Sequence, residues 1–585
     1  MAVEKLIVDH IDTWTTALQT RSTAGRGSSG KIDLYGIKKL RELILELAVR
    51  GKLVPQDSND EPASELLKRI AAEKAELVKQ GKIKKPKPLP EISEEEKPFE
   101  LPAGWEWVRL GDIGETNIGL TYSPNNVKET GTPVLRSSNI QNGILDFTDL
   151  VRVSDMEIKS SSYVEDGDLL ICARNGSKAL VGKNALISSL SEPMAFGAFM
   201  AIFRCNYNNY VKIFLDSPSF RRNLDGVDTT TINQITQSNL KHTLIPFPPE
   251  IEQEKIKNTV FELISLCDQL EQHSLTSLDA HQQLVETLLT TLTDSQNADE
   301  LAENWARISE HFDTLFTTEA SIDALKQTIL QLAVMGKLVP QDPNDEPATE
   351  LLKRIAQEKA QLVKDGKIKK QKPLPPISDE EKPFELPSGW EWCRLGSIFN
   401  FLNGYAFKSE WFSPAGLRLL RNANIAHGVT NWKDVVHIPN NMIADFENYI
   451  LSESDIVISL DRPIINTGLK YAIISKSDLP CLLLQRVAKF KNYANTVSNS
   501  FLTIWLESHF FTNSIDPGRS NGVPHISTKQ LEMTLFPLLS QSEQNRIILK
   551  TNELIKVCEK LKYRIKTIQQ TQLHLADALT DAAIN

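Results

Sequence analysis

The chain has few cysteines, no long apolar run and no signal-peptide pattern. Its six cysteines are scattered over 585 residues without a CxxC pair. This distribution predicts reduced thiols in the cytoplasm and argues against a cysteine-rich zinc site. No stretch approaches the ~20 apolar residues that span a bilayer. The N-terminus carries acidic residues early and lacks the apolar centre of a signal peptide, so we expect a cytoplasmic protein.

The chain also lacks an excess of positive charge. Its formal net charge is −10 and its pI is near 5.7. The two segments 101–250 and 386–540 each carry about as many acidic as basic side chains. A DNA-binding domain that works alone is usually clearly basic. The charge therefore counts against a free-standing DNA-binding role.

Catalytic signatures are missing as well. The sequence contains no NPPF or DPPY motif of adenine methyltransferases, and no glycine-rich cofactor loop follows a predicted strand. No HExxH motif or cluster of cysteine and histidine offers a metal site. These absences predict a non-catalytic chain that binds neither metal nor cofactor.

What the chain does have is one long passage that occurs twice. Residues 47–111 recur at 332–396 with a constant shift of 285, and only eleven of the 65 aligned positions differ. Two units cannot stack into a solenoid, so this is a duplicated module. A duplicated module typically gives a pseudo-two-fold molecule with two equivalent docking surfaces.

Each copy predicts the same local structure. An apolar helix ends at Gly51 or Gly336, and Ser321 is a good N-cap for the helix of the second copy. A charged helix over 64–80 is followed by a basic strap, KIKKPKPLP, which suits either a partner-binding segment or a solvated linker. A GWEW motif then leads into the next segment.

The segments that follow the two copies share landmarks but little identity. We call them insert 1 (residues 101–250) and insert 2 (386–540). VLRSSNIQNG at 134–143 aligns with LLRNANIAHG at 419–428, and FLDSPSF at 214–220 aligns with WLESHFF at 505–511. Short β-branched and aromatic runs broken by Gly, Asn and Ser predict strands. We expect an α+β protein with two similar strand-rich domains.

Long helices are predicted after each insert. Ile256, Val260, Leu263, Cys267 and Leu270 step by four and three, which is typical of a coiled-coil seam. The predicted stripe of the last helix contains Leu554, Cys558, Leu561, Ile565, Ile568, Leu575 and Leu579. The stripes predict spacer helices in an antiparallel coiled coil, although such a stripe can also be ordinary packing. A helix over 547–579 would be ~50 Å long.

The predicted organisation has seven parts. They are an N-terminal helical extension and linker (1–46), repeat 1 (47–100), insert 1 (101–250), a central helical spacer (251–331), repeat 2 (332–385), insert 2 (386–540) and a C-terminal spacer helix (541–585). Within the first part we expect a helix over 3–19 and a flexible linker over 22–31.

The repeat LAVxGKLVPQDxNDEPAxELLKRI, the lead-in FELPxGWEWxRLG and the exit LKHTLIPFPPEIEQEKI resemble the specificity subunits of type I restriction-modification systems. The second exit, LEMTLFPLLSQSEQNRI, has Leu538 and Leu539 where the first has Phe247 and Pro248. The resemblance implies two target-recognition domains that each read half of a split, asymmetric DNA site. It also implies helical spacers that set the gap between the halves.

The resemblance further implies partners. The repeats would dock two methyltransferase subunits, and restriction-translocase subunits would join through them. S-adenosylmethionine, ATP and Mg²⁺ are expected on those subunits, and no cofactor on this chain. Partners that close around the duplex would supply phosphate contacts, so this chain need not be basic.

Polar and cationic residues of the inserts are the candidates for reading bases, because Arg pairs with guanine and Asn or Gln with adenine. In insert 1 they are Arg136, Asn139, Arg174, Asn175, Lys178, Thr230 and Gln234. In insert 2 they are Arg421, Asn424, Asp461, Arg462, Arg519, Asn521 and His525. The pairs Arg136/Arg421 and Asn139/Asn424 occur in both inserts, and shared residues more often hold a turn or touch phosphate.

Two other functions remain open from the residues alone. One is an enzyme, a methyltransferase or nuclease with an unfamiliar site, which the purified chain would reveal by modifying or cutting DNA. The other is a protein-binding scaffold without a DNA role, which the acidic charge would suit.

Overall fold

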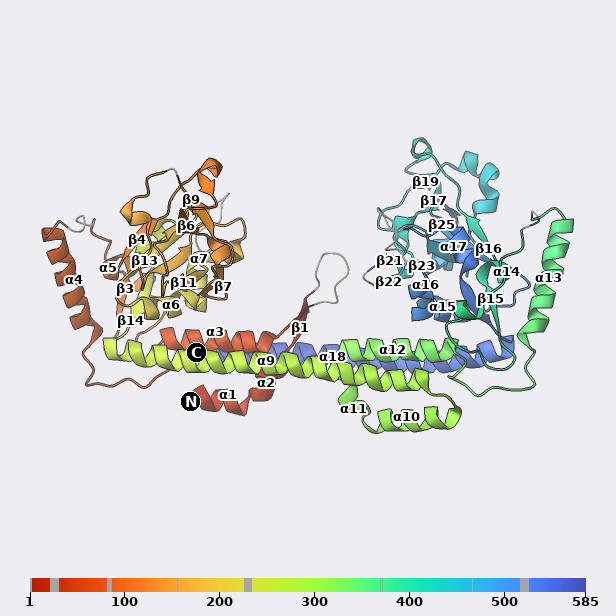
Figure 1. Cartoon of the computed structure of the whole chain (residues 1–585), viewed down its shortest axis with the longest axis horizontal. Coiled ribbons are helices and arrows are strands. Elements are labelled where there is room, and N and C mark those ends of the chain that lie inside the picture. The colour runs from red at the N-terminus through yellow and green to blue at the C-terminus, as the bar shows by residue number, and fades with distance from the viewer. Residues whose placement is uncertain are drawn as a thin grey trace. The chain divides into compact units, whose positions relative to one another are not determined.

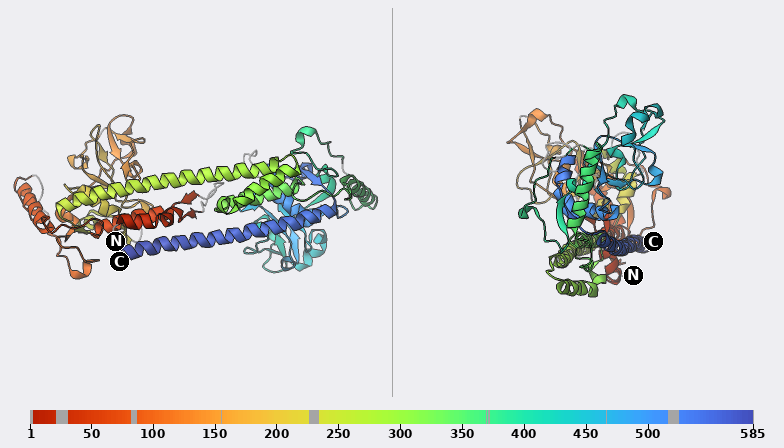
Figure 2. Two further views of the ribbon diagram at one scale, coloured as in Figure 1. Left: turned by 90° about the horizontal axis from the view of Figure 1, so that it is seen from below. Right: turned by 90° about the vertical axis from the view of Figure 1, so that its right-hand side faces the viewer.

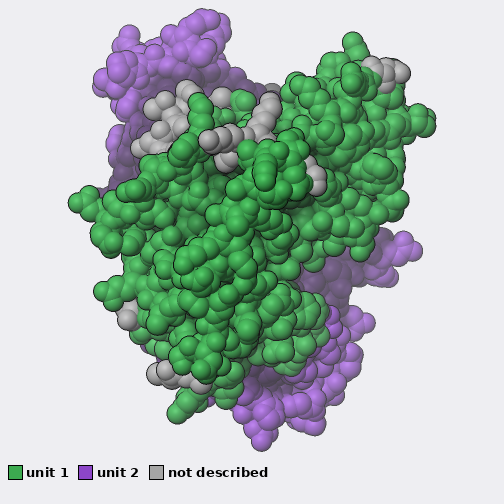
Figure 3. All heavy atoms as spheres, turned by 90° about the vertical axis from the view of Figure 1, so that its left-hand side faces the viewer, with its two compact units in different colours: residues 1–22, 30–276, 569–585 green, residues 23–29, 277–568 purple. Residues whose placement is uncertain are grey.

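The computed structural model describes residues 3–21, 31–81, 87–154, 156–225, 234–368, 370, 372–465, 467–515 and 525–584. The chain divides into two compact units, coloured in Figure 3. Unit 1 holds residues 1–22, 30–276 and 569–585, and unit 2 holds 23–29 and 277–568. The boundary falls inside two long helices, α9 (Glu250–Asp294) and α18 (Gln541–Ile584), which Figures 1 and 2 show. Each helix therefore contributes one end to each unit.

Unit 1 begins with short elements. They are α1 (Val3–Asp9), α2 (Ile11–Thr16), β1 (Gln19–Arg21), β2 (Lys31–Asp33) and α3 (Tyr35–Val49). The predicted single helix over 3–19 is wrong, because the chain turns after α1 so that Trp14 of α2 is fully buried. Gly36 opens α3 where an added Cβ would lie 2.3 Å from the Trp14 carbonyl oxygen. Of the predicted linker, residues 22–30 lie outside the described residues.

Insert 1 is built from short strands followed by helices. Its strands are β3 (Glu106–Arg109), β4 (Glu115–Ile118), β5 (Val127–Lys128), β6 (Thr132–Leu135), β7 (Ile140–Gln141), β8 (Ile144–Leu145), β9 (Val151–Val153), β10 (Leu169–Cys172), β11 (Asn184–Leu186), β12 (Ala195–Phe196), β13 (Met200–Arg204) and β14 (Leu244–Phe247). Its helices are α5 (Leu110–Ile113), α6 (Asn208–Asp216), α7 (Pro218–Asp225) and α8 (Gln237–His242). Two four-stranded sheets result, β11-β10-β13-β4 and β12-β6-β9-β5.

Insert 2 follows the same plan. Its strands are β15 (Glu391–Arg394), β16 (Phe399–Asn403), β17 (Leu417–Leu420), β18 (His427–Gly428), β19 (His437–Ile438), β20 (Ile456–Ser459), β21 (Ile464–Ile465), β22 (Gly468–Leu469), β23 (Tyr471–Ile473), β24 (Cys481–Leu483), β25 (Val487–Asn492) and β26 (Leu535–Leu538). Its helices are α14 (Leu395–Ile398), α15 (Asn499–Glu507), α16 (His509–Ser514) and α17 (Thr528–Met533). Its larger sheets are β16-β25-β20-β23-β18 and β19-β17-β24.

The central strands of both inserts are fully buried. All four residues of β10 (LLIC) and all four of β20 (IVIS) are buried, as expected for continuous apolar or β-branched runs covered on both faces. β10 pairs antiparallel with β13, and β20 pairs in the same way with β25. The predicted α+β class and the strand-rich character of both inserts are confirmed.

The repeats form the predicted helices. The charged helix is α4 (Ala63–Lys79) in the first copy and α13 (Ala348–Lys364) in the second. The second apolar helix is α12 (Glu319–Val334), which follows α10 (Ala298–Glu310) and α11 (Phe312–Leu315). Its N-cap is Thr318 and not Ser321, because Ser321 is the third helical residue and completes a capping box with Thr318.

Only part of the apolar stripe predicted for each spacer helix is buried. Ile256, Val260, Leu263 and Cys267 are buried in unit 1. In unit 2, Cys558 is buried and packs in a cluster with α12. Further along α18 the predicted stripe is wrong. Ile568 and Leu575 are exposed, while Ala576 and Thr580 are buried, because a 3.6-residue helix drifts away from a 3.5-residue repeat.

The repeat closes each insert at its two ends. β3, which follows Trp105 of the first GWEW motif, pairs antiparallel with the exit strand β14. β15 pairs in the same way with β26 in the second copy. The entrance and exit of each insert therefore lie on a two-stranded ribbon, whose entrance strand belongs to the duplicated passage 47–111 or 332–396.

Candidate nucleic-acid interface

Two of the candidates in insert 1 come together from distant parts of the chain. Arg174 follows β10, and Gln234 lies just before α8, yet the two form an antiparallel backbone bridge. The neighbouring Ile235 N–H donates to the Ala173 carbonyl oxygen over 2.7 Å. The Arg174 guanidinium also lies over the Phe199 ring, with Cζ 5.3 Å from the ring centroid. These three residues thus lie together at the end of β10.

The equivalent place in insert 2 holds different side chains. Asp461 follows β20 and bridges to His525, and Ile526 N–H donates to the Leu460 carbonyl oxygen over 2.8 Å. The Asp461 carboxylate accepts from Arg486 Nη1 at 3.4 Å. Ser459 Oγ donates to the Asp461 carbonyl oxygen over 2.7 Å and fixes the backbone there. Arg462 comes next, with an unusual φ of +46°.

These two clusters occupy the same position in the fold. Arg174 and Asp461 both stand two residues after the last paired residue of β10 or β20, and each bridges to a residue that precedes the last short helix of its insert. The strand pairing and the backbone bridge are therefore the same, while the side chains change from a cation and an amide to an acid and a histidine. A surface that keeps its strand pairing and changes its hydrogen-bonding groups is suited to reading two different ligands.

The shared candidates hold turns. Asn139 is 1% exposed, its Oδ1 accepts from the Arg136 N–H, and its Nδ2 donates to the carbonyl oxygens of Asp146 and Asp149. The Arg136 guanidinium pairs with the Asp149 carboxylate at 3.1 Å. These contacts give both residues a structural role in the turn.

The same turn occurs in insert 2. Asn424 is 1% exposed and donates to the carbonyl oxygens of Asn431 and Asp434. Arg421 pairs with the Asp434 carboxylate at 2.8 Å. We therefore leave these four residues out of the reading set proposed below.

The remaining candidates divide into described and undescribed residues. Asn175 Oδ1 accepts from the Ser177 N–H at 3.0 Å, so this side chain shapes its own loop. Lys178 opens a short 3₁₀ turn over Lys178–Leu180. Thr230, Arg519 and Asn521 lie outside the described residues, as do Lys82, Lys84, Lys85 and Lys369 of the two basic straps.

Sequence reasoning missed Phe199 and Arg486. Each directly precedes the strand that pairs with the central strand of its insert, β13 or β25. A shift of 287 aligns Cys172 with Ser459 and also aligns Phe199 with Arg486. This shift follows from the strand register, so the sequence alone did not mark the two residues.

In the part of the chain that the structure describes, no group of three or more His, Cys, Asp or Glu side chains could hold a metal ion. Likewise no described helix is long and apolar enough to cross a membrane.

Comparisons with known proteins agree on one family. The model of the type I restriction modification DNA specificity domain matches residues 102–280. The EcoAI specificity subunit of a type I restriction enzyme from Escherichia coli is 72% identical over the full length of both chains. The EcoEI specificity subunit, also from Escherichia coli, is 48% identical over the full length of both.

A solved structure supports the fold. It comes from work on complex assembly and conformational transition of the type I R-M system, and it matches 83% of this chain and 99% of its own with a TM-score of 0.51 and 16% identity. Specificity subunits are the component of these systems that recognises DNA sequence and carries no catalytic activity. With its full-length relatives, the chain belongs to the family of type I restriction-modification specificity subunits.

Proposed function

We propose that the two inserts are target-recognition domains, each of which reads one half of a split, asymmetric DNA site. The observation that carries this proposal is the pair of equivalent clusters, Arg174–Gln234 and Asp461–His525, at one position of the fold. Arginine and glutamine present donors that suit guanine and adenine, whereas an aspartate accepts from cytosine. Two readers with one backbone and different side chains would give two unrelated half-sites.

The repeats are the proposed docking surfaces for two methyltransferase subunits. α4 and α13 have nearly the same sequence and bury only one edge each, through Ala63 and Leu66 or through Ala348, Leu351 and Ile355. The rest of each helix is largely exposed and charged. Two nearly identical exposed helices suit two copies of one partner, and restriction-translocase subunits would join through that partner.

The long helices are the proposed spacer. α9 has 45 residues and α18 has 44, so each is ~67 Å long at 1.5 Å per residue. Half-sites one turn of DNA apart are ~34 Å apart, which such helices can cover. An antiparallel coiled coil of the two helices would give the pseudo-two-fold arrangement and would fix the unspecified gap in the target.

The proposed complex acts in the cytoplasm, and the near-neutral charge of the inserts fits it. Phosphate contacts position a protein on DNA, while base contacts specify the sequence. Partner subunits that surround the duplex would supply the phosphate contacts, so that the inserts need only present base-reading groups.

A methylome tests the proposal. The chain is expressed with its methyltransferase in a host free of adenine methylation, and N6-methyladenine is mapped with and without the gene for this chain. A split, asymmetric motif that appears only with the chain is the expected result. A stable complex that produces no motif, or methylation without sequence preference, would overturn the proposal in favour of a scaffold role.

A further inference from the structure

One turn has the same backbone hydrogen bonds in both inserts, but its tip carries an aromatic side chain in insert 1 and a cationic side chain in insert 2. In insert 1, Gly197 N–H donates to the Leu135 carbonyl oxygen over 2.9 Å, and Met200 N–H donates back to the Gly197 carbonyl oxygen over 2.8 Å. In insert 2, Leu484 N–H donates to the Leu420 carbonyl oxygen over 3.1 Å. The return bond joins Val487 N–H to the Leu484 carbonyl oxygen over 3.2 Å. The residue at the tip of this turn is Phe199 or Arg486.

The tip is fixed to the cluster already described. The Phe199 carbonyl oxygen accepts from the N–H groups of both Ala173 and Arg174, over 2.9 and 3.0 Å. The Arg486 carbonyl oxygen accepts from Leu460 N–H over 2.8 Å. The tip is therefore held against the end of the central strand in both inserts, and the side chain that it carries differs.

Phe199 presents its ring to solvent. It is 60% exposed, although the strand that it precedes is almost entirely buried. A single exposed apolar residue is ordinary by itself. Here the ring lies against the Arg174 guanidinium, and the pair forms a surface with one cationic and one apolar part.

Arg486 occupies an unfavourable backbone conformation. Its φ is +77°, a left-handed value that costs a non-glycine residue free energy and that clusters at functional sites. Its side chain is 60% exposed, and its Nη1 lies 3.4 Å from the Asp461 carboxylate. Glycine would hold the turn without strain, so the reason for arginine at this position lies in what its side chain reaches.

We propose that Phe199 and Arg486 are specificity-determining residues that contact bases, which rests on the DNA-reading function proposed above. They complete two equivalent reading sets, Arg174–Phe199–Gln234 and Asp461–Arg486–His525. The Phe199 ring has no hydrogen-bonding group, so it recognises the methyl group of a thymine. The Arg486 guanidinium recognises a guanine in the bidentate mode, and the Asp461 carboxylate orients it.

Variants of the full chain in complex with its methyltransferase test the assignment by methylome mapping. Phe199→Ala should relax one thymine position in one half-site, and Arg486→Gly should relax one guanine position in the other. A lost base contact should reduce discrimination at its position by roughly 10- to 100-fold. Unchanged motifs in both variants, or relaxation of the same half-site by both, would overturn the proposal.

Conservative variants keep the test valid if a truncated one fails to fold. Phe199→Leu retains an apolar contact and should keep part of the thymine preference. Arg486→Lys retains the charge but loses the bidentate geometry, so it should keep binding and lose guanine preference. Phe147→Ala is the matched control, because Phe147 is also an exposed aromatic of insert 1 (40%) outside the reading set, and it should leave the motif unchanged.

The wild-type chain in the same experiment separates the two proposals. If the wild type yields no split motif, the reading function itself fails. If the wild type yields the motif and Phe199→Ala and Arg486→Gly reproduce it at every position, only the assignment of these two residues fails.

Discussion

A buried carboxylate at the junction of α3 and insert 1 makes a strong prediction about stability. The Glu46 side chain is 0% exposed. Its carboxylate accepts from Arg50 Nε at 2.9 Å, from Arg222 Nη2 at 2.5 Å, and from both the N–H and the hydroxyl of Ser219 at 3.0 and 2.9 Å. Since Ser219 and Arg222 belong to α7, this one carboxylate joins α3 to insert 1. Glu46→Gln should therefore loosen the junction.

The magnitude follows from the exposure of the partners. Breaking a fully buried ion pair costs about 3–5 kcal/mol, whereas an exposed pair contributes less than about 1 kcal/mol. Glu46 is buried, Arg50 is 20% exposed, and Arg222 is 56% exposed and can recover water. The retained amide oxygen keeps part of the hydrogen bonding. We expect a loss of about 3 kcal/mol in the free energy of unfolding of unit 1.

The effect should also depend on pH. Burial by itself would raise the pKa of Glu46, but the hydrogen bonds from Arg50, Arg222 and Ser219 outweigh burial, and the pKa is lowered from its ordinary value. A lowered pKa in the folded state gives stability that is complete above the ordinary glutamate pKa and is lost as pH falls through the folded-state pKa. The difference between wild type and Glu46→Gln should be constant near neutral pH and should shrink in acid.

Urea unfolding, with hydrogen exchange of α3 and α7 amides to locate the change, measures this prediction. The second copy offers a natural control, because Gln331 and Met335 stand where the first has Glu46 and Arg50. Gln331→Ala removes a long hydrogen bond of 3.3 Å to His509 and should cost less than about 1 kcal/mol. Equal unfolding of Glu46→Gln and wild type, or unchanged exchange in α3, would refute the reasoning.

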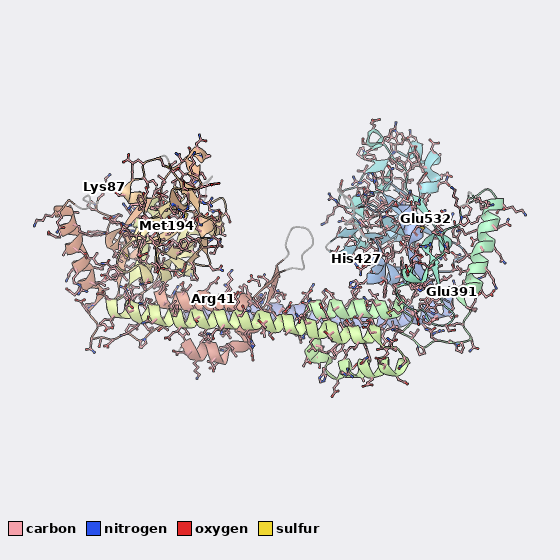
Figure 4. All side chains as sticks on the ribbon, viewed as in Figure 1. Arg41, Lys87, Met194, Glu391, His427 and Glu532 are labelled. Carbon is pink, nitrogen blue, oxygen red and sulfur yellow. The ribbon has the colours of Figure 1, made fainter. Side chains whose placement is uncertain are left out.

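Three further predictions concern the spacers and the junctions. Inserting four residues between Ser274 and Ser277 adds ~6 Å of helix, and the methylome should show a gap longer by about one or two base pairs; an unchanged gap would contradict the spacer role. Arg41 of α3, labelled in Figure 4, pairs with Asp268 and Glu271 of α9 at 2.5 and 2.6 Å. Because these acids are well exposed, a double-mutant cycle of Arg41→Ala and Asp268→Ala should give a coupling of only about 0.2–1 kcal/mol. Trp390→Phe removes the 2.8 Å hydrogen bond that the indole N–H donates to Glu543, whose pKa is raised by burial. This bond favours the charged carboxylate, so its removal raises the pKa further, and the loss of about 1.5–3 kcal/mol should be larger at pH 7.5 than at pH 4. Equal losses at the two pH values would count against this account.

Local patterns made much of the architecture predictable. The glycine that ends the apolar helix of each repeat has the expected left-handed conformation, with φ of +65° at Gly51 and +71° at Gly336. Both glycines also lie against the proline and tryptophan of the following lead-in, where an added Cβ would come within about 2.5 Å of the proline ring. The helices, from their periodicity, and the buried strands, from their continuous apolar runs, were equally predictable from the sequence. The buried face at the C-terminal end of α18 was not, because a helix of 3.6 residues per turn drifts away from the 3.5-residue stripe from which it was predicted.

The candidate site was only half predictable. Arg174 and Gln234 were identifiable as polar residues in divergent loops, but their bridge joins positions 60 residues apart, and no local pattern encodes such a contact. Nothing in the sequence distinguishes Phe199 from a core aromatic, since it adjoins the buried run of β13. Arg136 and Asn139 are candidates because their residue types suit base reading. Their position at a buried turn shows a structural use that the shared pattern had already suggested.

One set of contacts explains how a constant repeat can carry divergent inserts. Arg109, which lies in the duplicated passage 47–111, donates to the carbonyl oxygens of Pro90 and His242, both at 3.0 Å. Arg394 makes the same contacts in the second copy, to the carbonyl oxygens of Pro375 at 2.9 Å and Met533 at 2.8 Å.

His242 and Met533 differ completely as side chains, yet the arginine meets only their backbone. The ribbon that closes each insert is likewise held by backbone hydrogen bonds, between β3 and β14 or between β15 and β26. Contacts of this kind place no demand on the side chains of the insert. The insert is therefore free to change the residues at the end of its central strand, where the two reading sets lie, while its attachment to the repeat stays the same.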